Sequence, residues 1–142
     1  MGRQLQIAVD CADPERLAAF WAEVLGYRVA DPPPGRADWA DFSRAEAQEP
    51  DEAWCMAVDP EGSGPTVLFH KVPEDKVVKN RLHLDVWVAP RGGSVEANRP
   101  VVDAEVRRLV GLGATEIRRV SENDQCFVVM GDPEGNEFCV CG

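Results

Sequence analysis

Two histidines are the residues with the widest chemical repertoire in this chain of 142 residues. His83 alternates with Asp85 in the stretch 81–88, so both side chains are expected on one face of a strand. An imidazole close to carboxylates can be held in one tautomer and can exchange protons with a bound molecule. We therefore predict that His83 and Asp85 are catalytic, with His83 as the acid/base and Asp85 contacting the ligand or tuning the histidine.

The same predicted strand face also carries Arg81 and Trp87. Such a mixture is typical of a ligand-binding cavity, although the solvent side of an antiparallel sheet can be polar as well. Trp39, Trp54 and Trp87 are expected to stack on a planar ligand, and for Trp54 packing in the core is an equally good interpretation. Arg81, Trp54 and Trp87 are therefore predicted to bind a ligand.

The elements that must position these residues follow from an internal repeat. The tetrapeptide Asp-Pro-Glu-Gly occurs at residues 59–62 and again at 132–135. Asp, Pro and Gly at the first, second and fourth positions suit a type I turn. Each copy ends a segment that opens with a strand and a helix, so the chain is predicted to contain one half-domain twice.

In the first half, alternation at residues 5–10 predicts a strand. Asp13 and Pro14 suit the start of a helix, an apolar stripe follows, and Gly26 suits its end. A short strand is expected at 27–30 and two more near 52–58 and 66–71. Three consecutive prolines and scattered acids predict a long loop at 31–51.

The second half repeats this order. A strand is predicted at 81–88, with an apolar face made of Leu82, Leu84, Val86 and Val88. An inserted loop at 89–99, a helix from about Pro100 to Gly113, and strands near 115–120, 126–130 and 137–141 follow. The pattern is βαβββ twice, which predicts an α+β fold.

Each sheet of such a fold must bury its apolar face under its own helix. The opposite faces are expected to curve around a shared cup in which a small molecule binds. The loops 31–51 and 89–99 are long and border the expected mouth, so they are predicted to set specificity.

Composition narrows the function classes. Fifteen basic and 25 acidic residues give a net charge of −10, which disfavours nucleic acid and anionic membranes as partners. No apolar run is long enough for a bilayer and no signal-peptide pattern is present, so a cytoplasmic protein is expected. Five cysteines without a C-x-x-C pair predict reduced thiols that fill the core.

Three motifs at residues 10–21 (DCADPERLAAFW), 79–85 (KNRLHLD) and 132–139 (DPEGNEFC) resemble a glyoxalase-like member of the vicinal oxygen chelate superfamily. The resemblance covers nearly the whole chain. It implies a single domain at 1–142, with modules at about 1–75 and 76–142 that form a curved mixed sheet around a cup. It also implies a homodimer.

The resemblance implies a metal site as well. In metal-dependent relatives the ligands come from the first and last strands of each module, and Gln6 and His83 fall on the two first-strand positions. Cys139 and Leu68 stand where a glutamate is usual, and His70 follows Leu68 on the same face. The metal set is therefore Gln6, His70 and His83, for Zn, Ni, Mn or Fe, although we favour a cup without a metal. Gln6 and Cys139 are also predicted ligand contacts.

Members of the superfamily isomerise hemithioacetals, cleave aromatic rings, open epoxides or sequester drugs such as bleomycin. We predict an enzyme of lyase, isomerase or dioxygenase type that uses the cup around His83, and not a true glyoxalase I. The alternative is a drug-sequestering binding protein without catalysis. A fold by itself does not decide between these functions.

Overall fold

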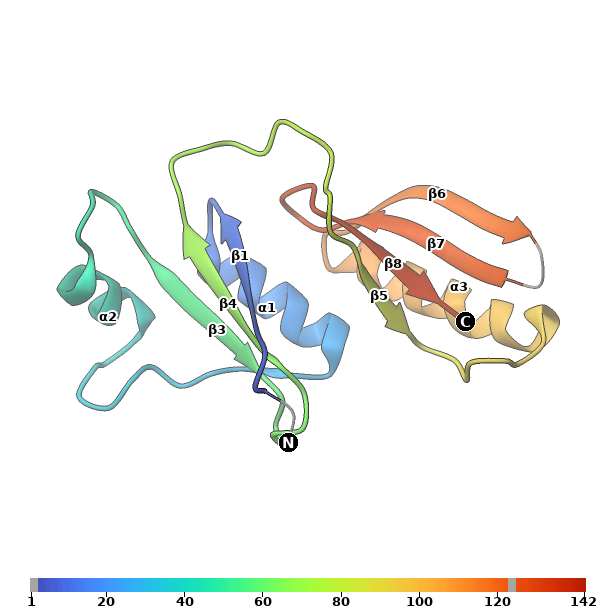
Figure 1. Ribbon diagram of the computed structural model, residues 1–142, viewed down its shortest axis with the longest axis horizontal. Helices are drawn as coiled ribbons and strands as arrows, with labels where there is room; N and C mark the ends of the chain where they lie inside the picture. Colours follow the sequence, from blue (N-terminus) through green and yellow to red (C-terminus); the bar gives the residue numbers. More distant parts are fainter. Residues whose placement is uncertain (1–2, 123–124) are drawn as a thin grey trace. The chain divides into compact units, whose positions relative to one another are not determined.

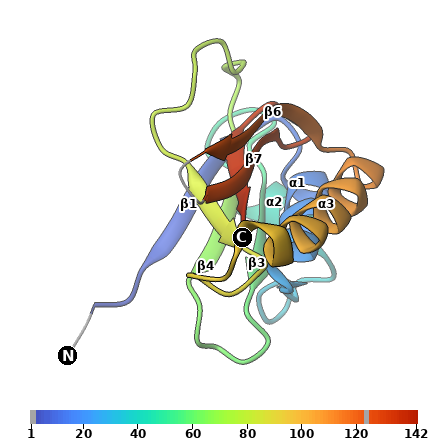
Figure 2. The same cartoon turned by 90° about the vertical axis from the view of Figure 1, so that its right-hand side faces the viewer.

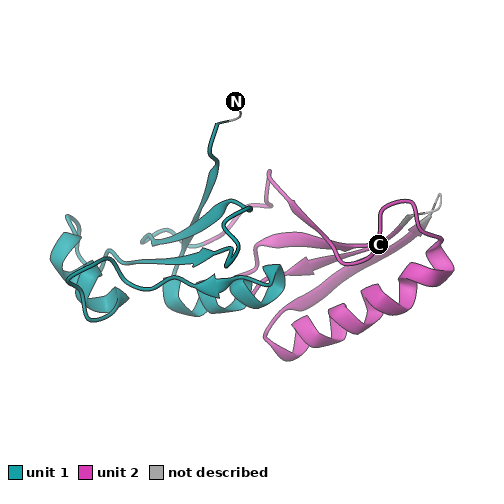
Figure 3. Cartoon of the chain, turned by 90° about the horizontal axis from the view of Figure 1, so that it is seen from below, with its two compact units in different colours: residues 1–75 teal, residues 76–142 magenta. Residues whose placement is uncertain are grey.

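The computed structural model describes residues 3–122 and 125–142 and divides into two compact units, residues 1–75 and 76–142 (Figure 3). Unit 1 contains β1 (Gln6–Cys11), α1 (Pro14–Leu25), β2 (Arg28–Val29), α2 (Trp39–Glu46), β3 (Trp54–Val58) and β4 (Thr66–Lys71). Unit 2 contains β5 (Leu84–Trp87), α3 (Val95–Gly111), β6 (Thr115–Glu122), β7 (Gln125–Gly131) and β8 (Glu137–Cys141). Among these described elements, no helix combines the length and apolar character needed to cross a membrane.

Each unit has a four-stranded mixed sheet in which the first and last strands of the unit lie side by side (Figure 1). The strand orders are β1-β4-β3-β2 and β5-β8-β7-β6. The pairs β1–β4 and β5–β8 are parallel, and all other pairs are antiparallel. The predicted α+β fold with a repeated βαβββ order is confirmed.

One face of each sheet is buried under a helix of its own unit. In unit 1, α1 packs against β2, β3 and β4, and in unit 2, α3 packs against β6, β7 and β8 (Figure 2). The strand residues under these helices are fully buried: Cys55, Ala57, Val67 and Phe69 in unit 1, and Val128, Met130, Phe138 and Val140 in unit 2. Because side chains alternate along a strand, the residues between them form a second face. Among the described elements, no helix of unit 2 packs on this face, whereas in unit 1 α2 meets it at Trp54 through Phe42. The name helix-free face is used below for this second face.

The ends of α1 agree with the prediction. The Asp13 side chain accepts a hydrogen bond from the Arg16 N–H at 3.2 Å, and Pro14 occupies the first turn. Gly26 ends the helix with a φ of 68°, a left-handed conformation that costs glycine little.

The two Asp-Pro-Glu-Gly turns are also confirmed. The Gly62 N–H donates to the Asp59 carbonyl at 3.0 Å, and the Gly135 N–H donates to the Asp132 carbonyl at 2.9 Å. These bonds close the turns that lead into β4 and β8, so the repeat places the last strand of each unit in the same way.

The loop expected at 31–51 is partly wrong, because α2 lies within it. The Asp38 side chain accepts from the Asp41 N–H at 2.6 Å and so caps the helix. Trp39 is buried, and its indole N–H donates to the Ala30 carbonyl at 2.7 Å. A helix of 8 residues with few apolar side chains is too short to show a clear 3.6-residue period.

The start of α3 was predicted too late. The helix begins at Val95, where the Ser94 hydroxyl accepts from the Ala97 N–H at 3.2 Å, so residues 95–99 are not a loop. Pro100 lies inside the helix and is not its first residue. A proline removes one backbone donor, and the helix continues past it.

The strand predicted at 81–88 is also shorter than expected, because β5 covers Leu84 to Trp87 only. Leu82 is 73% exposed and does not belong to the buried apolar face. His83 therefore lies immediately before the strand, and Arg81 lies in the exposed segment that leads to it.

Candidate functional site

The helix-free face of unit 2 gathers most of the predicted site residues. Three rows of side chains cross β5, β8 and β7, as the pairing register and the alternation along each strand require. The first row holds His83 and Glu137. The second row is Asp85, Cys139 and Val129, and the third row is Trp87, Cys141 and Phe127.

In the first row, His83, Glu137 and Lys79 meet. His83 Nε2 lies 3.3 Å from Glu137 Oε2 and 3.5 Å from Lys79 Nζ, and Lys79 Nζ also donates to Glu137 Oε2. The His83 side chain is 32% exposed and the Glu137 side chain 19%, so both stay in reach of a bound molecule. We call these three residues the His83 trio.

The Glu137 carboxyl is held ionised by its neighbours. Its pKa is lowered from the ordinary value of 4.5, chiefly by the hydrogen bond from Lys79 and further by the charges of Lys79, His83 and Lys76, against an opposing effect of desolvation. A charged carboxylate can accept a hydrogen bond or stabilise a nearby cation, but it cannot donate.

The second row places Asp85 beside a thiol and not beside His83. The pKa of the Cys139 thiol is raised to about 11, first by burial and then by the nearby carboxylate of Asp85, to which the thiol is hydrogen-bonded. The pKa of the Cys141 thiol in the third row is raised to about 12, again mainly by burial. Both groups remain neutral thiols at pH 7, so neither is a ready nucleophile.

The third row ends at Trp87, which is 43% exposed. The guanidinium carbon of Arg91 lies 4.5 Å from the centre of the Trp87 ring, in the geometry of a cation–π contact. Trp87 lies four positions after His83, which is roughly 13 Å along an extended strand.

The helix-free face of unit 1 has three corresponding rows across β1, β4 and β3. They are Gln6, Thr66 and Val58; then Ala8, Leu68 and Met56; and finally Asp10, His70 and Trp54. Gln6 and His70 therefore stand at opposite ends of this face, and the structure does not bring them together.

His70 contacts acidic and aromatic neighbours. Its Nε2 lies 2.8 Å from Glu52 Oε1, and its Nδ1 lies 3.9 Å from Asp10 Oδ1. The Trp54 ring is stacked on the imidazole with centroids 5.3 Å apart and an interplanar angle of 2°. Both ring nitrogens lie near carboxylates, and the His70 side chain is 31% exposed, close to the 32% of His83.

Trp54 belongs to an aromatic cluster that also includes Phe42 and Trp39. The Phe42 ring meets Trp54 at 5.9 Å and Trp39 at 5.6 Å, both edge to face. Trp39 is buried, so the expectation that it stacks on a ligand is wrong. Trp54 is contacted by His70 and Phe42, which matches the core-packing interpretation more closely than the ligand-binding one.

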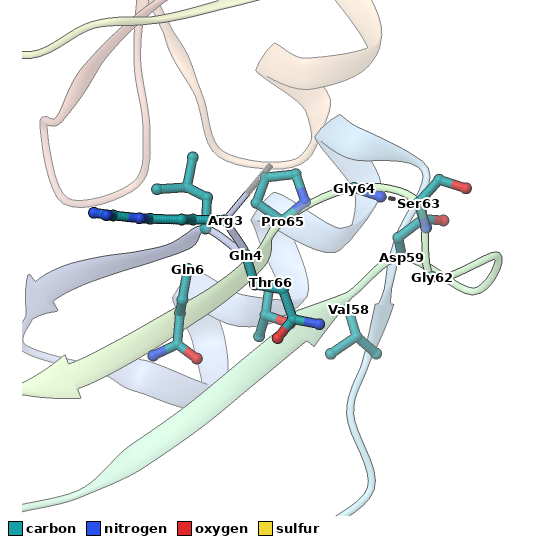
Figure 4. A pocket seen from close by; sticks show the side chains of 11 residues that line it. Arg3, Gln4, Gln6, Val58, Asp59, Gly62, Ser63, Gly64, Pro65 and Thr66 are labelled. Carbon is teal, nitrogen blue, oxygen red and sulfur yellow. Dashed lines mark hydrogen bonds between the residues drawn. The ribbon is translucent and has the colours of Figure 1, made fainter. Parts of the chain in front are cut away.

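A hollow of about 620 Å³ lies at the Gln6 end of unit 1 (Figure 4). It is lined by residues 3–6, Val58, Asp59 and residues 62–66. The Asp59 carboxylate shapes its rim by accepting from the Ser63 N–H at 2.9 Å and the Gly64 N–H at 2.7 Å. The hollow therefore lies against an ordered loop, and Gln6 is one of the residues that line it.

The donors within each unit do not fit the metal that the resemblance implies. In unit 2, the Lys79 ammonium is ion-paired with the Glu137 carboxylate that would have to bind an ion beside His83. In the described part of the chain, no three His, Cys, Asp or Glu side chains form a group that could hold a metal ion. No chemical step below is therefore routed through a metal.

Sequence reasoning missed Glu137, Lys79 and Glu52. Glu137 and Lys79 lie inside the quoted motifs, and Glu137 shares its strand face with Cys139, so alternation in the last strand could have singled it out. Glu52 lies before β3 and gave no periodic signal. Arg81 is exposed, and none of the contacts of the His83 trio in the described part of the chain involves it.

A family model described as a glyoxalase-like domain matches residues 6–141, which is nearly the whole chain. Comparison with curated proteins finds no match.

Several solved structures have a similar fold. A fosfomycin resistance protein, FosX, from Mesorhizobium loti has a TM-score of 0.64 at 12% identity, covering 99% of this chain and 91% of its own. A glyoxylase/bleomycin resistance protein/dioxygenase domain from Frankia has a TM-score of 0.63 at 12% identity, covering 99% and 97%. A glyoxalase/bleomycin resistance protein/dioxygenase family enzyme from Burkholderia phytofirmans has a TM-score of 0.61 at 16% identity, covering 96% of this chain and 94% of its own. At such identities the likeness shows the fold alone.

Proposed function

We propose a function for this chain, which belongs to the glyoxalase-like domain family of the vicinal oxygen chelate superfamily. It is an enzyme that transfers protons to and from a small molecule at His83. The observation that carries this proposal is the His83 trio. His83 contacts an ammonium and a carboxylate at once, on a sheet face that no helix of its unit covers among the residues that the structure describes.

The trio suits both protonation states of the imidazole. An ammonium can donate only to an unprotonated ring nitrogen, whereas a carboxylate stabilises a protonated ring. Lys79 therefore supports the neutral base before proton transfer, and Glu137 supports the imidazolium after it. The proton taken from a carbon or oxygen of the substrate resides on His83 and returns to a neighbouring atom, which is an isomerase or lyase reaction.

Other residues of the same face serve as ligand contacts in this proposal. Asp85, Trp87 and Cys139 lie in the next two rows, and their mixture of acid, indole and neutral thiol suits an organic molecule. Gln6 remains a proposed ligand contact of the hollow in unit 1.

The test is proton exchange measured by NMR in D2O. Hemithioacetals, epoxides, catechols and fosfomycin, which appears in the names of structural neighbours, would be incubated with the wild type and with His83→Asn. We expect exchange or conversion of one substrate class, reduced about 10²- to 10⁴-fold in the variant. His70→Asn is the matched control and should keep its turnover. Full activity of His83→Asn would exclude the proposal.

A second candidate function is ligand binding without turnover. The half-exposed indole of Trp87 offers a stacking surface, and the net charge of −10 favours a cationic planar drug. Saturable binding of bleomycin with no chemical change, lost in Trp87→Ala and kept in His83→Asn, would support this function over catalysis.

We also propose a cytoplasmic homodimer, because the family resemblance implies this assembly. Sedimentation equilibrium tests it, and a mass of one chain across the concentration range would contradict it.

A further inference from the structure

Arg91 is held in an unusual way for a cation in an acidic protein. Its guanidinium lies over the Trp87 indole, and it makes no ion pair with a carboxylate among the side chains that the structure describes. A guanidinium stacked on an aromatic ring keeps its N–H fork free at the edge, and this fork matches a planar oxyanion in a bidentate fashion. Arg91 is therefore oriented for an anion without being neutralised by the protein.

The side chains next to Trp87 on this face are apolar, and Asp85 and Arg118 are charged residues of the second row. The apolar members of the second and third rows are Cys139, Cys141, Phe127 and Val129. Burial keeps the thiols of Cys139 and Cys141 neutral. Arg118 in β6 pairs with Val129 in β7 and so extends the second row. Asp85 is the carboxylate of these rows, and its neighbour is Cys139.

We propose that Arg91, held on Trp87, is the anion-binding residue of a specificity subsite, and that the substrate is an organic acid with an apolar body. The oxyanion would bind at Arg91, the body would lie over the thiols and Phe127, and the reacting atom would lie at His83. The separation between Trp87 and His83, roughly 13 Å, sets the length of such a molecule. This inference rests on the proposed function for the reaction at His83, whereas the binding of the anion does not.

The net charge of −10 does not oppose this subsite. At an ionic strength of about 0.1 M the Debye length is roughly 10 Å, so exposed charges beyond the rows are largely screened. The guanidinium in direct contact with the oxyanion decides the local preference.

The test uses NMR of the Trp87 indole N–H, assigned with Trp87→Phe. The probes are 4-phenylbutanoate, 3-phenylpropylphosphonate, 4-phenylbutanol and 4-phenylbutylamine. We expect saturable shifts with both acids, stronger for the phosphonate if phosphate-like groups are the natural anion and for the carboxylate if carboxylic acids are. The alcohol and the amine should bind at least about tenfold more weakly.

The variants are Arg91→Gln, Arg91→Lys and the matched control Arg107→Gln, which removes the same charge from the exposed side of α3. Arg91→Gln should weaken binding of the acids at least about tenfold, Arg91→Lys less, and Arg107→Gln not at all. Equal affinity for acid and alcohol, no effect of Arg91→Gln, or no saturable shift with either acid would overturn the inference.

Failure of this inference can be told apart from failure of the proposed function. His83→Asn should bind the acids like the wild type, because Arg91 and Trp87 are unchanged. If binding depends on Arg91 and no substrate turns over, the subsite stands and the enzyme proposal fails. If turnover depends on His83 but Arg91→Gln converts acids and alcohols alike, the enzyme proposal stands and the subsite fails.

Discussion

The two units build the same sheet and place their histidines at opposite ends of it. In unit 1, His70 lies in the third row, beside Asp10 at the end of β1. In unit 2, His83 lies in the first row, next to Glu137 at the start of β8. Both units therefore bury the covered face under a helix, whereas the polar residues of the opposite face differ between them.

The two imidazoles also differ in what holds them. His70 is stacked on Trp54 and directed at Glu52 and Asp10, so its neighbours immobilise it. His83 shares Glu137 with the exposed ammonium of Lys79, and no aromatic ring is stacked on it in the described part of the chain. A histidine fixed by a full set of partners suits a structural role, and one with a shared partner suits proton transfer.

Exchanging the two histidines for asparagine gives the largest expected contrast. His83→Asn should lower turnover about 10²- to 10⁴-fold with little change in thermal stability. His70→Asn should lower the melting temperature and leave turnover per folded molecule unchanged. The measurements are steady-state kinetics and differential scanning calorimetry, and equal activity losses in both variants would remove the contrast.

Truncating one large core side chain in each unit tests whether the covered faces are equivalent. Phe69 and Phe138 are fully buried under α1 and α3, so Phe69→Ala and Phe138→Ala should each destabilise the protein by about 3–5 kcal/mol. Urea denaturation measures both values. A cost below about 1 kcal/mol for either variant would mean that its covered face is not close-packed.

The helix ends offer a smaller contrast. Gly26 has a φ of 68°, so Gly26→Ala should destabilise the protein by about 1 kcal/mol. Gly111 ends α3 with space around its Cα, and Gly111→Ala should stabilise by a few tenths of a kcal/mol. Opposite signs in thermal denaturation support this assignment, and equal signs contradict it.

The smallest expected effect concerns pH and the turn before β4. Hydrogen bonds from the N–H groups of Glu61, Gly64 and Ser63, opposed by desolvation, lower the pKa of the Asp59 carboxyl below its ordinary value of 3.8. Because the folded pKa is depressed, this contribution to stability is complete above the unfolded pKa and is lost as the pH falls through the folded pKa.

Asp59→Asn should therefore flatten the stability profile below about pH 4 and leave its shape near neutrality unchanged. Urea midpoints measured across this acid range test the prediction, with Asp31→Asn as an exposed control. An identical acid slope in Asp59→Asn and the wild type would show that the depressed carboxyl does not contribute.

Sequence patterns predicted the fold well where burial is one-sided and regular. α1 and its caps, β4 at Thr66–Lys71 and β8 at Glu137–Cys141 appear where alternation and capping residues placed them. The errors lie at α2, at the start of α3 and at the start of β5, where a short helix, an internal proline and exposed leucines break the periodic signal.

The site was predictable only in part. Alternation puts Asp85, Trp87 and Cys139 on one face, as the pairing of β5 with β8 requires. Alternation did not indicate which residues meet across strands. These pairs are Asp85 with Cys139, His83 with Glu137, and His70 with Glu52. Residues far apart in sequence become neighbours through strand register, which alternation along a single strand does not contain.

The sequence by itself determined the repeated βαβββ order, the turns at Asp59 and Asp132, and the faces on which most site residues lie, because these depend on local propensity and on the period of apolar residues. Only the tertiary structure decided which side chains meet across that order. The parallel pairing of the first and last strands brings Lys79 and His83 to Glu137, more than fifty positions later in the chain. Local sequence cannot specify such a contact, because it arises from the burial of a whole sheet under its helix.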